Sequence, residues 1–140
     1  MDISTLIRSA FEAQKNAYAP YSGFQVGAAL LAENGEIFKG CNIENASYGA
    51  AICAERTAFV KAVSQGVRRF RAIAIVGKPT NEEKFEECAP CGICRQVMAE
   101  FCDPDTFEII LPTGYEEYKI YTLRELLPLG FTAENLRKDK

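Results

Sequence analysis

The chain has 140 residues, a formal net charge of -3, six cysteines and no histidine. A chain of this length forms one domain, which we expect to span residues 1–140, and it buries enough surface to fold without disulfides. The absence of histidine excludes Ser-His and Cys-His nucleophiles, imidazole bases and histidine-ligated metals. A proton carrier must therefore be a carboxylate, lysine, tyrosine or cysteine, and a soft metal ligand must be sulfur.

The hydrophobic pattern predicts alternating helices and strands. In chain order, it predicts a helix over residues 3–17, strands over 25–33 and 36–43, a helix over 54–65, a strand over 70–76, a helix over 92–101, and strands over 107–111 and 118–121. An antiparallel pair followed by strand–helix–strand crossovers predicts an α/β fold. We expect three α/β/α layers, with one five-stranded mixed sheet covered by helices on both faces.

Turn and cap signals mark several ends of these elements. Asn34-Gly35 predicts a two-residue hairpin of type I′, which needs positive φ at both residues. Gly66 fits the left-handed position that follows a helix. Thr122 with Glu125 three residues later predicts a capping box for a short helix. The acidic stretch of residues 81–87 is typical of a loop.

Three cysteines stand at the starts of predicted helices. Cys91 and Cys94 are three residues apart, so their sulfurs point the same way on a first helical turn, and Cys53 begins another helix. A helix N-terminus favours the thiolate, which is the form that binds metal. Zinc suits a tetrahedral sulfur site, and three protein ligands leave a fourth position open. We therefore expect one Zn²⁺ per chain.

Glu55 turns this metal site into a catalytic one, because a carboxylate beside the metal can take a proton from water and later deliver it. Residues two apart on a helix point about 200° away from each other. Cys53 and Glu55 therefore both face the metal only if Cys53 occupies the cap, before the regular helix begins. Three thiolates leave one surplus negative charge around Zn²⁺, so we expect a cation beside the sulfurs. The adjacent Arg56 is the first candidate, and Arg95 is a weaker one.

Other interpretations of the cysteines remain open. A single Cys-x-x-Cys pair also fits a redox dithiol, although that leaves Cys53 and Glu55 without a role. A structural zinc site needs a fourth ligand, which Cys88, Cys41 or Cys102 would supply. Cys41 and Cys102 also fit plain buried side chains, and Cys88 fits either a buried side chain or a loop thiol.

The segment Cys53-Ala54-Glu55, followed by Pro90-Cys91-x-x-Cys94, resembles the signature of the zinc nucleobase deaminases in its three-cysteine form. The small, homotetrameric cytidine deaminases show segments similar to residues 21–30, 40–49 and 126–128. The resemblance covers nearly the whole chain. It implies zinc-dependent hydrolytic deamination of cytidine and deoxycytidine to uridine and deoxyuridine with release of ammonia, as part of pyrimidine salvage.

The resemblance also implies a role for each matching residue. The implied zinc ligands are Cys53, Cys91 and Cys94, and the implied proton carrier is Glu55. The implied substrate residues are Phe24 against the pyrimidine, Asn42 and Glu44 at the ribose hydroxyls, and Ala46, Tyr48 and Phe131, which complete the sites of neighbouring subunits in a homotetramer. Asn42 and Glu44 alternate along a predicted strand, so both lie on one face, as a ribose clamp requires.

Charge narrows the choice of substrate and partner. The Glu44 carboxylate would repel a nucleotide phosphate, which favours an unphosphorylated nucleoside. The acidic balance argues against a nucleic-acid partner, and the small basic clusters at residues 68–71 and 137–140 fit solvated faces. The alternatives are a deaminase of a related nucleoside such as blasticidin S, or a zinc-stabilised interaction module without catalysis.

The first residues carry no targeting signal. They lack the basic start and apolar core of a secretory signal, and no run of about 18 apolar residues predicts a membrane span. We therefore expect a cytoplasmic protein with reduced thiols and no membrane partner.

Overall fold

The computed structural model describes residues 1–84 and 86–136. In chain order its elements are α1 (Ile3–Gln14), β1 (Phe24–Ala32), β2 (Ile37–Cys41), the 3-10 turn η1 (Tyr48–Ala50), α2 (Ala54–Ser64), β3 (Phe70–Pro79), α3 (Gly92–Phe101), β4 (Glu108–Pro112), β5 (Tyr118–Thr122), α4 (Leu123–Leu126) and α5 (Ala133–Leu136). Every predicted helix and strand is present, within three residues of its predicted bounds. The basic cluster at residues 137–140 lies outside the described residues.

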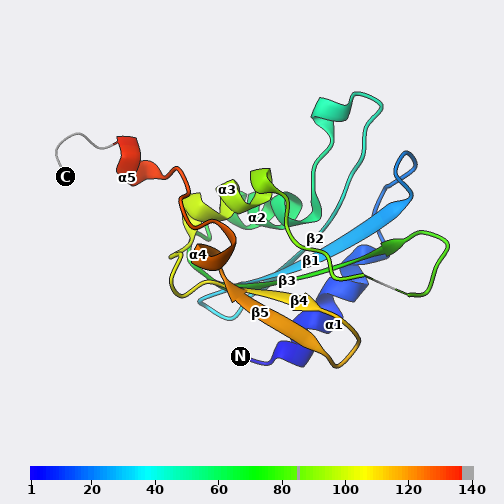
Figure 1. Ribbon diagram of the computed structural model, residues 1–140, viewed down its shortest axis with the longest axis horizontal. Coiled ribbons are helices and arrows are strands. Elements are labelled where there is room, and N and C mark those ends of the chain that lie inside the picture. Colours follow the sequence, from blue (N-terminus) through cyan, green and yellow to red (C-terminus); the bar gives the residue numbers. More distant parts are fainter. Residues whose placement is uncertain (85, 137–140) are drawn as a thin grey trace.

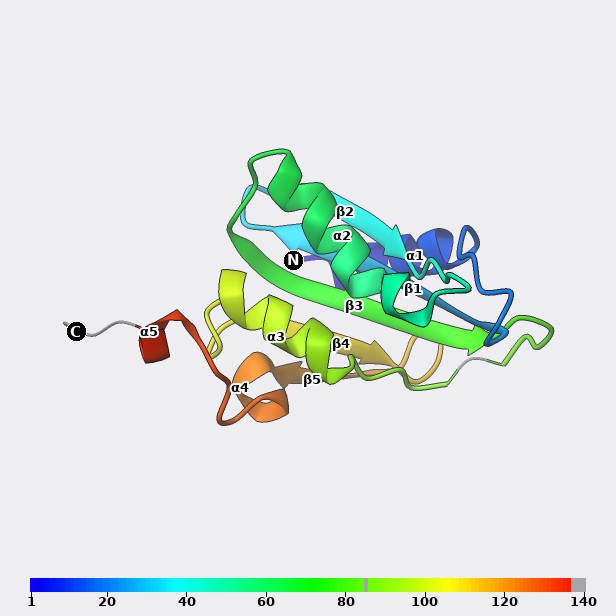
Figure 2. The same ribbon diagram turned by 90° about the horizontal axis from the view of Figure 1, so that it is seen from above.

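The five strands form one mixed sheet in the order β2-β1-β3-β4-β5. β1 pairs antiparallel with both β2 and β3, β3 pairs parallel with β4, and β4 pairs antiparallel with β5. The parallel pair is joined through α3, whereas the connection through α2 carries the chain across β1 (Figures 1 and 2). The predicted five-stranded mixed sheet is therefore confirmed.

Helices cover both faces of this sheet. α1 packs on one face, where Leu6, Ile7 and Ala10 join side chains of β1 and β3 in a buried cluster. α2, α3 and α4 lie on the opposite face, where Phe59 and Met98 belong to a second buried cluster (Figure 1). The predicted three-layer α/β/α fold is confirmed.

Two glycines allow the helices to approach the sheet closely. A Cβ atom at Gly27 of β1 would lie 2.1 Å from the carbonyl oxygen of Ala10. A Cβ atom at Gly40 of β2 would lie 2.5 Å from the carbonyl oxygen of Ala54 and 2.5 Å from the backbone nitrogen of Ala58. Because no side chain fits in either gap, the first turn of α2 lies directly on the backbone of β2. This contact fixes the helix start that carries part of the candidate site.

Two predicted elements end earlier than expected because tertiary contacts replace the regular pattern there, and β3 continues to Pro79 instead of ending at residue 76. The first helix ends at Gln14 instead of residue 17, and soon afterwards the backbone nitrogen of Tyr18 donates to the carbonyl oxygen of Asn42 at 2.9 Å. β2 ends at Cys41 instead of residue 43, because Ile43 forms an isolated bridge with Tyr18 outside the sheet. The chain after β2 therefore leaves the sheet to meet the loop after α1.

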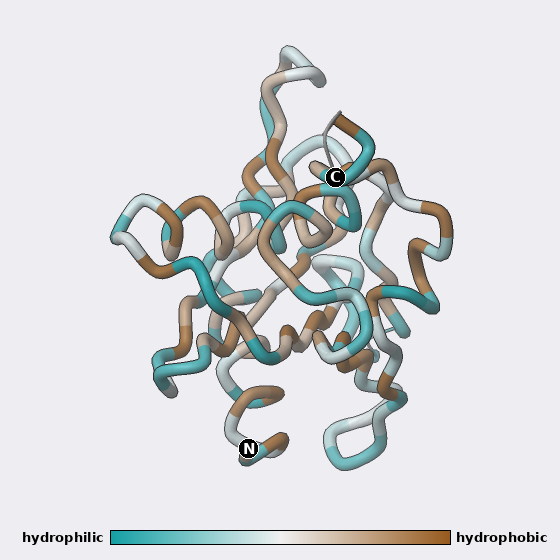
Figure 3. Tube along the Cα trace, turned by 90° about the vertical axis from the view of Figure 1, so that its left-hand side faces the viewer, coloured by the Kyte–Doolittle hydropathy of each residue, from teal (hydrophilic) through white to brown (hydrophobic). Residues whose placement is uncertain are grey.

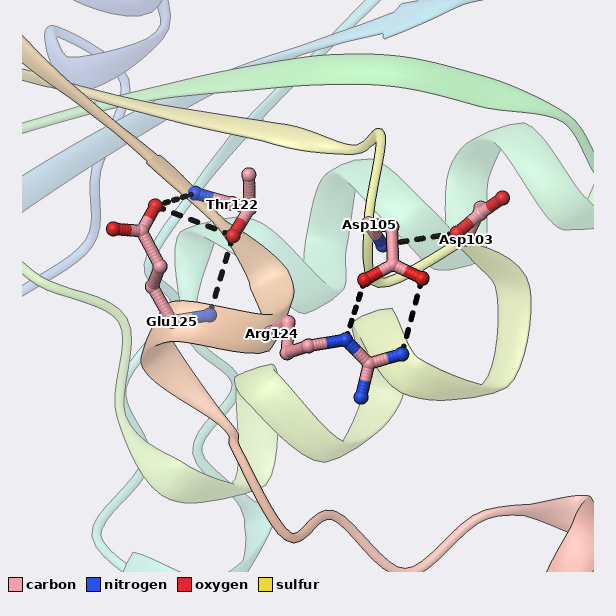
Figure 4. Close-up of polar contacts among 5 residues, drawn as sticks. All are labelled: Asp103, Asp105, Thr122, Arg124 and Glu125. Atoms are coloured by element: carbon pink, nitrogen blue, oxygen red, sulfur yellow. Dashed lines mark hydrogen bonds and ion pairs between the residues drawn. The ribbon is translucent and has the colours of Figure 1, made fainter.

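The turn and cap predictions are partly right. The β1–β2 hairpin is not of type I′, because Gly35 has a φ of 94° while Asn34 does not have a positive φ. Gly66 follows α2 with a φ of 91°, as predicted. Thr122 and Glu125 form the predicted capping box, which Figure 4 shows. Only one residue of the hairpin turn needs the left-handed conformation, and that residue is a glycine.

The segment after α4, residues 127–136, is here called the C-terminal segment. It extends away from the sheet (Figure 1), and hydrophobic and hydrophilic residues are mixed near its end (brown and teal beside the C label in Figure 3). Leu129, Phe131 and Leu136 are exposed on this segment. Among the residues described, no helix has both the length and the hydrophobicity needed to cross a membrane.

Candidate active site

Three sulfurs converge where α2 and α3 begin. Cys53 is the N-cap of α2, Cys91 is the N-cap of α3, and Cys94 lies in the first turn of α3. The Sγ atoms of Cys53 and Cys91 are 3.8 Å apart, those of Cys91 and Cys94 are 3.5 Å apart, and all three lie within 4.8 Å of one another. Zinc–sulfur bonds of about 2.3 Å at tetrahedral angles separate two sulfurs by about 3.8 Å. These residues, here called the cysteine cluster, therefore have the donors and the spacing of a zinc site.

The Glu55 carboxylate faces the cysteine cluster from the first turn of α2. Cys53 has extended backbone angles, φ -76° and ψ 156°, so it precedes the regular helix as predicted, and both side chains can face one point. Glu55 is only 4% exposed. Burial raises the pKa of Glu55 to about 7, against hydrogen bonds from its own backbone N–H and from the Cys94 thiol. A carboxyl group with a near-neutral pKa both accepts and delivers protons readily.

The Arg56 guanidinium contacts the cluster through Cys53. Its Nη2 donates to the Sγ of Cys53 at 3.8 Å and to the carbonyl oxygen of Ala51 at 3.5 Å. Its Nε is buried and has no hydrogen-bond partner among the described residues. The pKa of Cys53 falls to about 5, first because of its contact with the Cys94 sulfur and then because Arg56 donates to it, and these contacts outweigh burial. Arg56 thus favours the thiolate that binds metal.

Arg95, the weaker candidate for this role, makes different contacts. Its Nε donates to the carbonyl oxygen of Pro90 and its Nη1 to that of Leu126, each at 2.7 Å. The guanidinium of Arg95 therefore binds backbone carbonyls. These contacts do not support the prediction that it donates to a cysteine sulfur.

The remaining cysteines do not complete a four-sulfur site. In residues 1–84 and 86–136, the cysteine cluster is the only group of three or more histidine, cysteine, aspartate or glutamate side chains placed to hold a metal ion. Cys102 is buried in the core as expected, whereas Cys41 is only half-buried. Burial raises the pKa of Cys88 to about 12, with a further contribution from the negative charge of Glu55. The cluster thus leaves the open coordination position that catalysis needs.

Asn42 and Glu44 both reach toward the segment that leads into β1. The side-chain amide of Asn42 accepts from the backbone of β1 at 2.9 Å and donates to it at 2.9 Å. The Glu44 carboxylate accepts from the backbone nitrogens of Tyr21 and Ser22, at 2.9 and 3.0 Å, and from the Ser22 hydroxyl. These hydrogen bonds, that of the hydroxyl first, lower the pKa of Glu44. The sequence did not predict these contacts, because they join residues between 16 and 23 positions apart.

The Phe24 ring packs on the backbone of β3. A Cβ atom at Gly77 would lie 2.8 Å from Cε2 of Phe24 and 3.1 Å from the Sγ of Cys88. The ring and this thiol therefore meet over Gly77, where only a glycine leaves the space that they occupy. Neither Gly77 nor Cys88 was predicted as part of the site, since no local pattern in the sequence indicates this packing.

The remaining predicted substrate residues are exposed. Ala46 lies on the loop between β2 and α2, and Tyr48 of the same loop is 80% exposed. The Tyr48 ring meets that of Tyr21 edge-on at 6.5 Å, and both border a cavity of about 260 Å³ that Glu44 also lines. Phe131 is 59% exposed on the C-terminal segment, which leads away from the starts of α2 and α3 (Figure 2).

Fold and site together define a class of protein: a three-layer α/β enzyme with sulfur donors for a metal ion and a buried carboxylate, suited to the activation of water. The family model of the cytidine and deoxycytidylate deaminase zinc-binding region matches residues 1–108. The chain is 48% identical over 136 residues to the cytidine deaminase of Sporosarcina psychrophila, with 97% of this chain and 96% of that protein covered. The crystal structure of a cytidine deaminase from Burkholderia pseudomallei matches with a TM-score of 0.84 and 46% identity, over 94% of this chain and 100% of that one.

This chain belongs to the cytidine and deoxycytidylate deaminase family. Its cofactor is zinc, and the sulfur donors and spacing of the cysteine cluster fit that ion. A more distant relative, the blasticidin-S deaminase of Bacillus cereus, is 34% identical over 110 residues, which is 76% of each chain. The family resemblance predicted from the sequence is confirmed.

Proposed function

We propose that this protein catalyses the hydrolytic deamination of cytidine and deoxycytidine, which yields uridine or deoxyuridine and ammonia for pyrimidine salvage. The observation that carries the proposal is the buried Glu55 carboxylate facing three converging cysteine sulfurs at the starts of two helices. Residues 1–140 act as one domain in this account, which is supported by the single sheet that contains all five strands.

The chemistry is divided between the cysteine cluster and Glu55. Cys53, Cys91 and Cys94 hold zinc, which acts when bound as a Lewis acid and makes water more acidic. Glu55 takes a proton from the attacking water and passes it to N3 of cytosine while the oxygen adds at C4. Glu55 then moves a second proton to the amino nitrogen, and the C–N bond breaks to release ammonia. The buried position of Glu55 keeps both transfers apart from bulk water.

The nucleoside is held by side chains around the start of β1. The Phe24 ring lies against the pyrimidine, and Asn42 and Glu44 bind the ribose hydroxyls, chiefly the 3′ hydroxyl. The contacts of Asn42 and Glu44 with residues 21–26 support this role, because they hold both side chains at the start of β1, where Phe24 lies. The negative charge of the Glu44 carboxylate also favours a neutral nucleoside over a nucleotide.

We further propose that the sites are completed in a homotetramer, where Ala46, Tyr48 and Phe131 reach neighbouring subunits. The exposure of large apolar side chains supports this, with Leu129 98% exposed beside Phe131 on the C-terminal segment. Light scattering of the purified protein measures the assembly directly. Six free thiols support a reducing, cytoplasmic location, in which the cluster stays available to zinc.

Ultraviolet absorbance on mixing the zinc-loaded protein with different nucleosides tests the proposed activity. Cytidine and deoxycytidine should be converted with one ammonia released per product. Cytidine monophosphate should be converted with a kcat/KM at least about tenfold lower than that of cytidine, because Glu44 repels its phosphate. Conversion of blasticidin S alone would support the alternative deaminase. A zinc-bound protein that converts none of the four compounds would contradict the proposal and favour an interaction module.

Arg56 offers a test of the charge balance at the cluster. Three thiolates around Zn²⁺ carry one net negative charge, and the Arg56 guanidinium offsets it through Cys53. We expect Arg56→Gln to lower both zinc affinity and kcat by about tenfold, which is typical when a partner of a metal ligand is lost. Competition with a chelator and initial rates with cytidine measure the two effects. Unchanged values of both would remove this role from Arg56.

A further inference from the structure

Arg95 of α3 joins two segments that are distant in the sequence. Its Nε donates to the carbonyl oxygen of Pro90 and its Nη1 to the carbonyl oxygen of Leu126, each at 2.7 Å. The planar guanidinium points its N–H groups in fixed directions, so one side chain can hold two carbonyls at once. Hydrogen bonds of this length from a charged donor are stronger than those between neutral groups.

Each of the two carbonyls needs a partner from outside its own segment. Pro90 is buried and immediately precedes Cys91, the N-cap of α3, so its carbonyl lies before the helix that follows. Leu126 is the last residue of α4, and the final carbonyls of a helix have no partner within it. Arg95 satisfies both, and it thereby fixes the backbone next to a cysteine of the cluster.

The next residue of α3 extends this connection to the C-terminal segment. The side-chain amide of Gln96 donates to the carbonyl oxygen of Phe131. Two consecutive residues of α3 therefore bind the backbone at the end of α4 and in the middle of the C-terminal segment. The same helix carries Cys94 in its first turn.

We propose that Arg95 is a positioning residue that ties the Cys91 end of the cysteine cluster to the end of α4. Zinc retention and the position of the end of α4, from which the C-terminal segment leaves, then depend on one side chain. The proposal relies on the proposed function only for the assignment of the cysteine cluster as the zinc site. It adds that the segment carrying Phe131 and the loop carrying Cys91 are held in one arrangement.

The test compares Arg95→Gln and Arg95→Lys with Arg124→Gln in the zinc-loaded protein. Arg124 is a matched control, because it also anchors α4, but through an exposed ion pair with Asp105 (Figure 4). Exposed pairs of this kind contribute little to stability. The readouts are the rate of zinc transfer to a chromogenic chelator and the hydrogen exchange of the backbone amides of residues 127–131.

We expect Arg95→Gln to lose zinc about tenfold faster than the wild type, as for other partners of a metal site. Amide exchange in residues 127–131 should rise in the same variant. In both readouts Arg95→Lys should lie between the wild type and Arg95→Gln, because an ammonium group cannot hold both carbonyls in the same geometry. Arg124→Gln should stay within about twofold of the wild type in both readouts.

Zinc loss from Arg95→Gln at the wild-type rate would overturn the proposal, and so would an equal acceleration in Arg124→Gln. If Arg95→Gln does not fold, Arg95→Lys decides alone, and zinc loss from it at the wild-type rate overturns the proposal. These readouts do not use cytidine. A failure of the proposed activity, with zinc still bound, therefore leaves the test of Arg95 intact.

Discussion

Replacing Glu55 with glutamine is expected to abolish nearly all cytidine turnover while the protein keeps one zinc per chain. The amide has almost the same shape as the carboxyl group, but it cannot take a proton from water or deliver one to the substrate. General acid–base catalysis alone contributes about 10²–10⁴-fold, and here one group serves both transfers. Because Glu55 is buried, the neutral amide also avoids the cost of burying a charge, so the fold should be retained.

Glu100→Gln is the matched control for this change, since Glu100 is exposed on α3 and its replacement should leave the rate unchanged. Metal analysis and initial rates with cytidine are measured on the same samples. Activity within about tenfold of the wild type in Glu55→Gln would reject Glu55 as the proton carrier, because it lies below the range for lost acid–base catalysis.

Replacing Cys94 with alanine is expected to remove both zinc and activity, whereas the same change at Cys102 should remove neither. Both thiols are buried against the same core, with exposures of 1% for Cys94 and 9% for Cys102. The two variants therefore lose a similar amount of apolar packing, and only Cys94→Ala loses a ligand. Zinc sites of this kind need all their protein ligands, so two sulfurs should not retain the ion against a chelator.

Zinc content per chain and thermal unfolding of the two variants measure this contrast. We expect the two variants to lose a similar amount of thermal stability, while only Cys94→Ala loses zinc. Full zinc retention by Cys94→Ala would show that the ion is held elsewhere, and zinc loss by Cys102→Ala would place Cys102 among the ligands.

The fold could be predicted largely from the sequence, because the hydrophobic period distinguishes helices from strands in this chain. The strand over residues 70–76 and the helix over residues 92–101 are bounded by clear turns, and both are present. The errors lie where distant backbone contacts replace the pattern. The loop after α1 pairs with the chain around Ile43, and no local signal indicates a contact between segments about 25 residues apart.

The cysteine cluster could also be predicted, because helix geometry restricts where its members can lie. Cys53 must precede α2 if it shares a site with Glu55, and it does. The partners of these residues were less predictable. Arg95 follows Cys94 in the sequence, but its guanidinium turns to the carbonyls of Pro90 and Leu126, a choice that only the packing of α4 against α3 determines.

The zinc-edge X-ray absorption spectrum of the wild-type protein tests the central claim, a three-sulfur site with one open position, most directly. The account predicts three sulfurs at about 2.3 Å and one lighter atom as the fourth neighbour of zinc. The cysteine cluster supplies the three sulfurs, and solvent or substrate supplies the fourth neighbour. A spectrum with four sulfurs would contradict the account, because it would describe a closed structural site in which Glu55 has no water to activate.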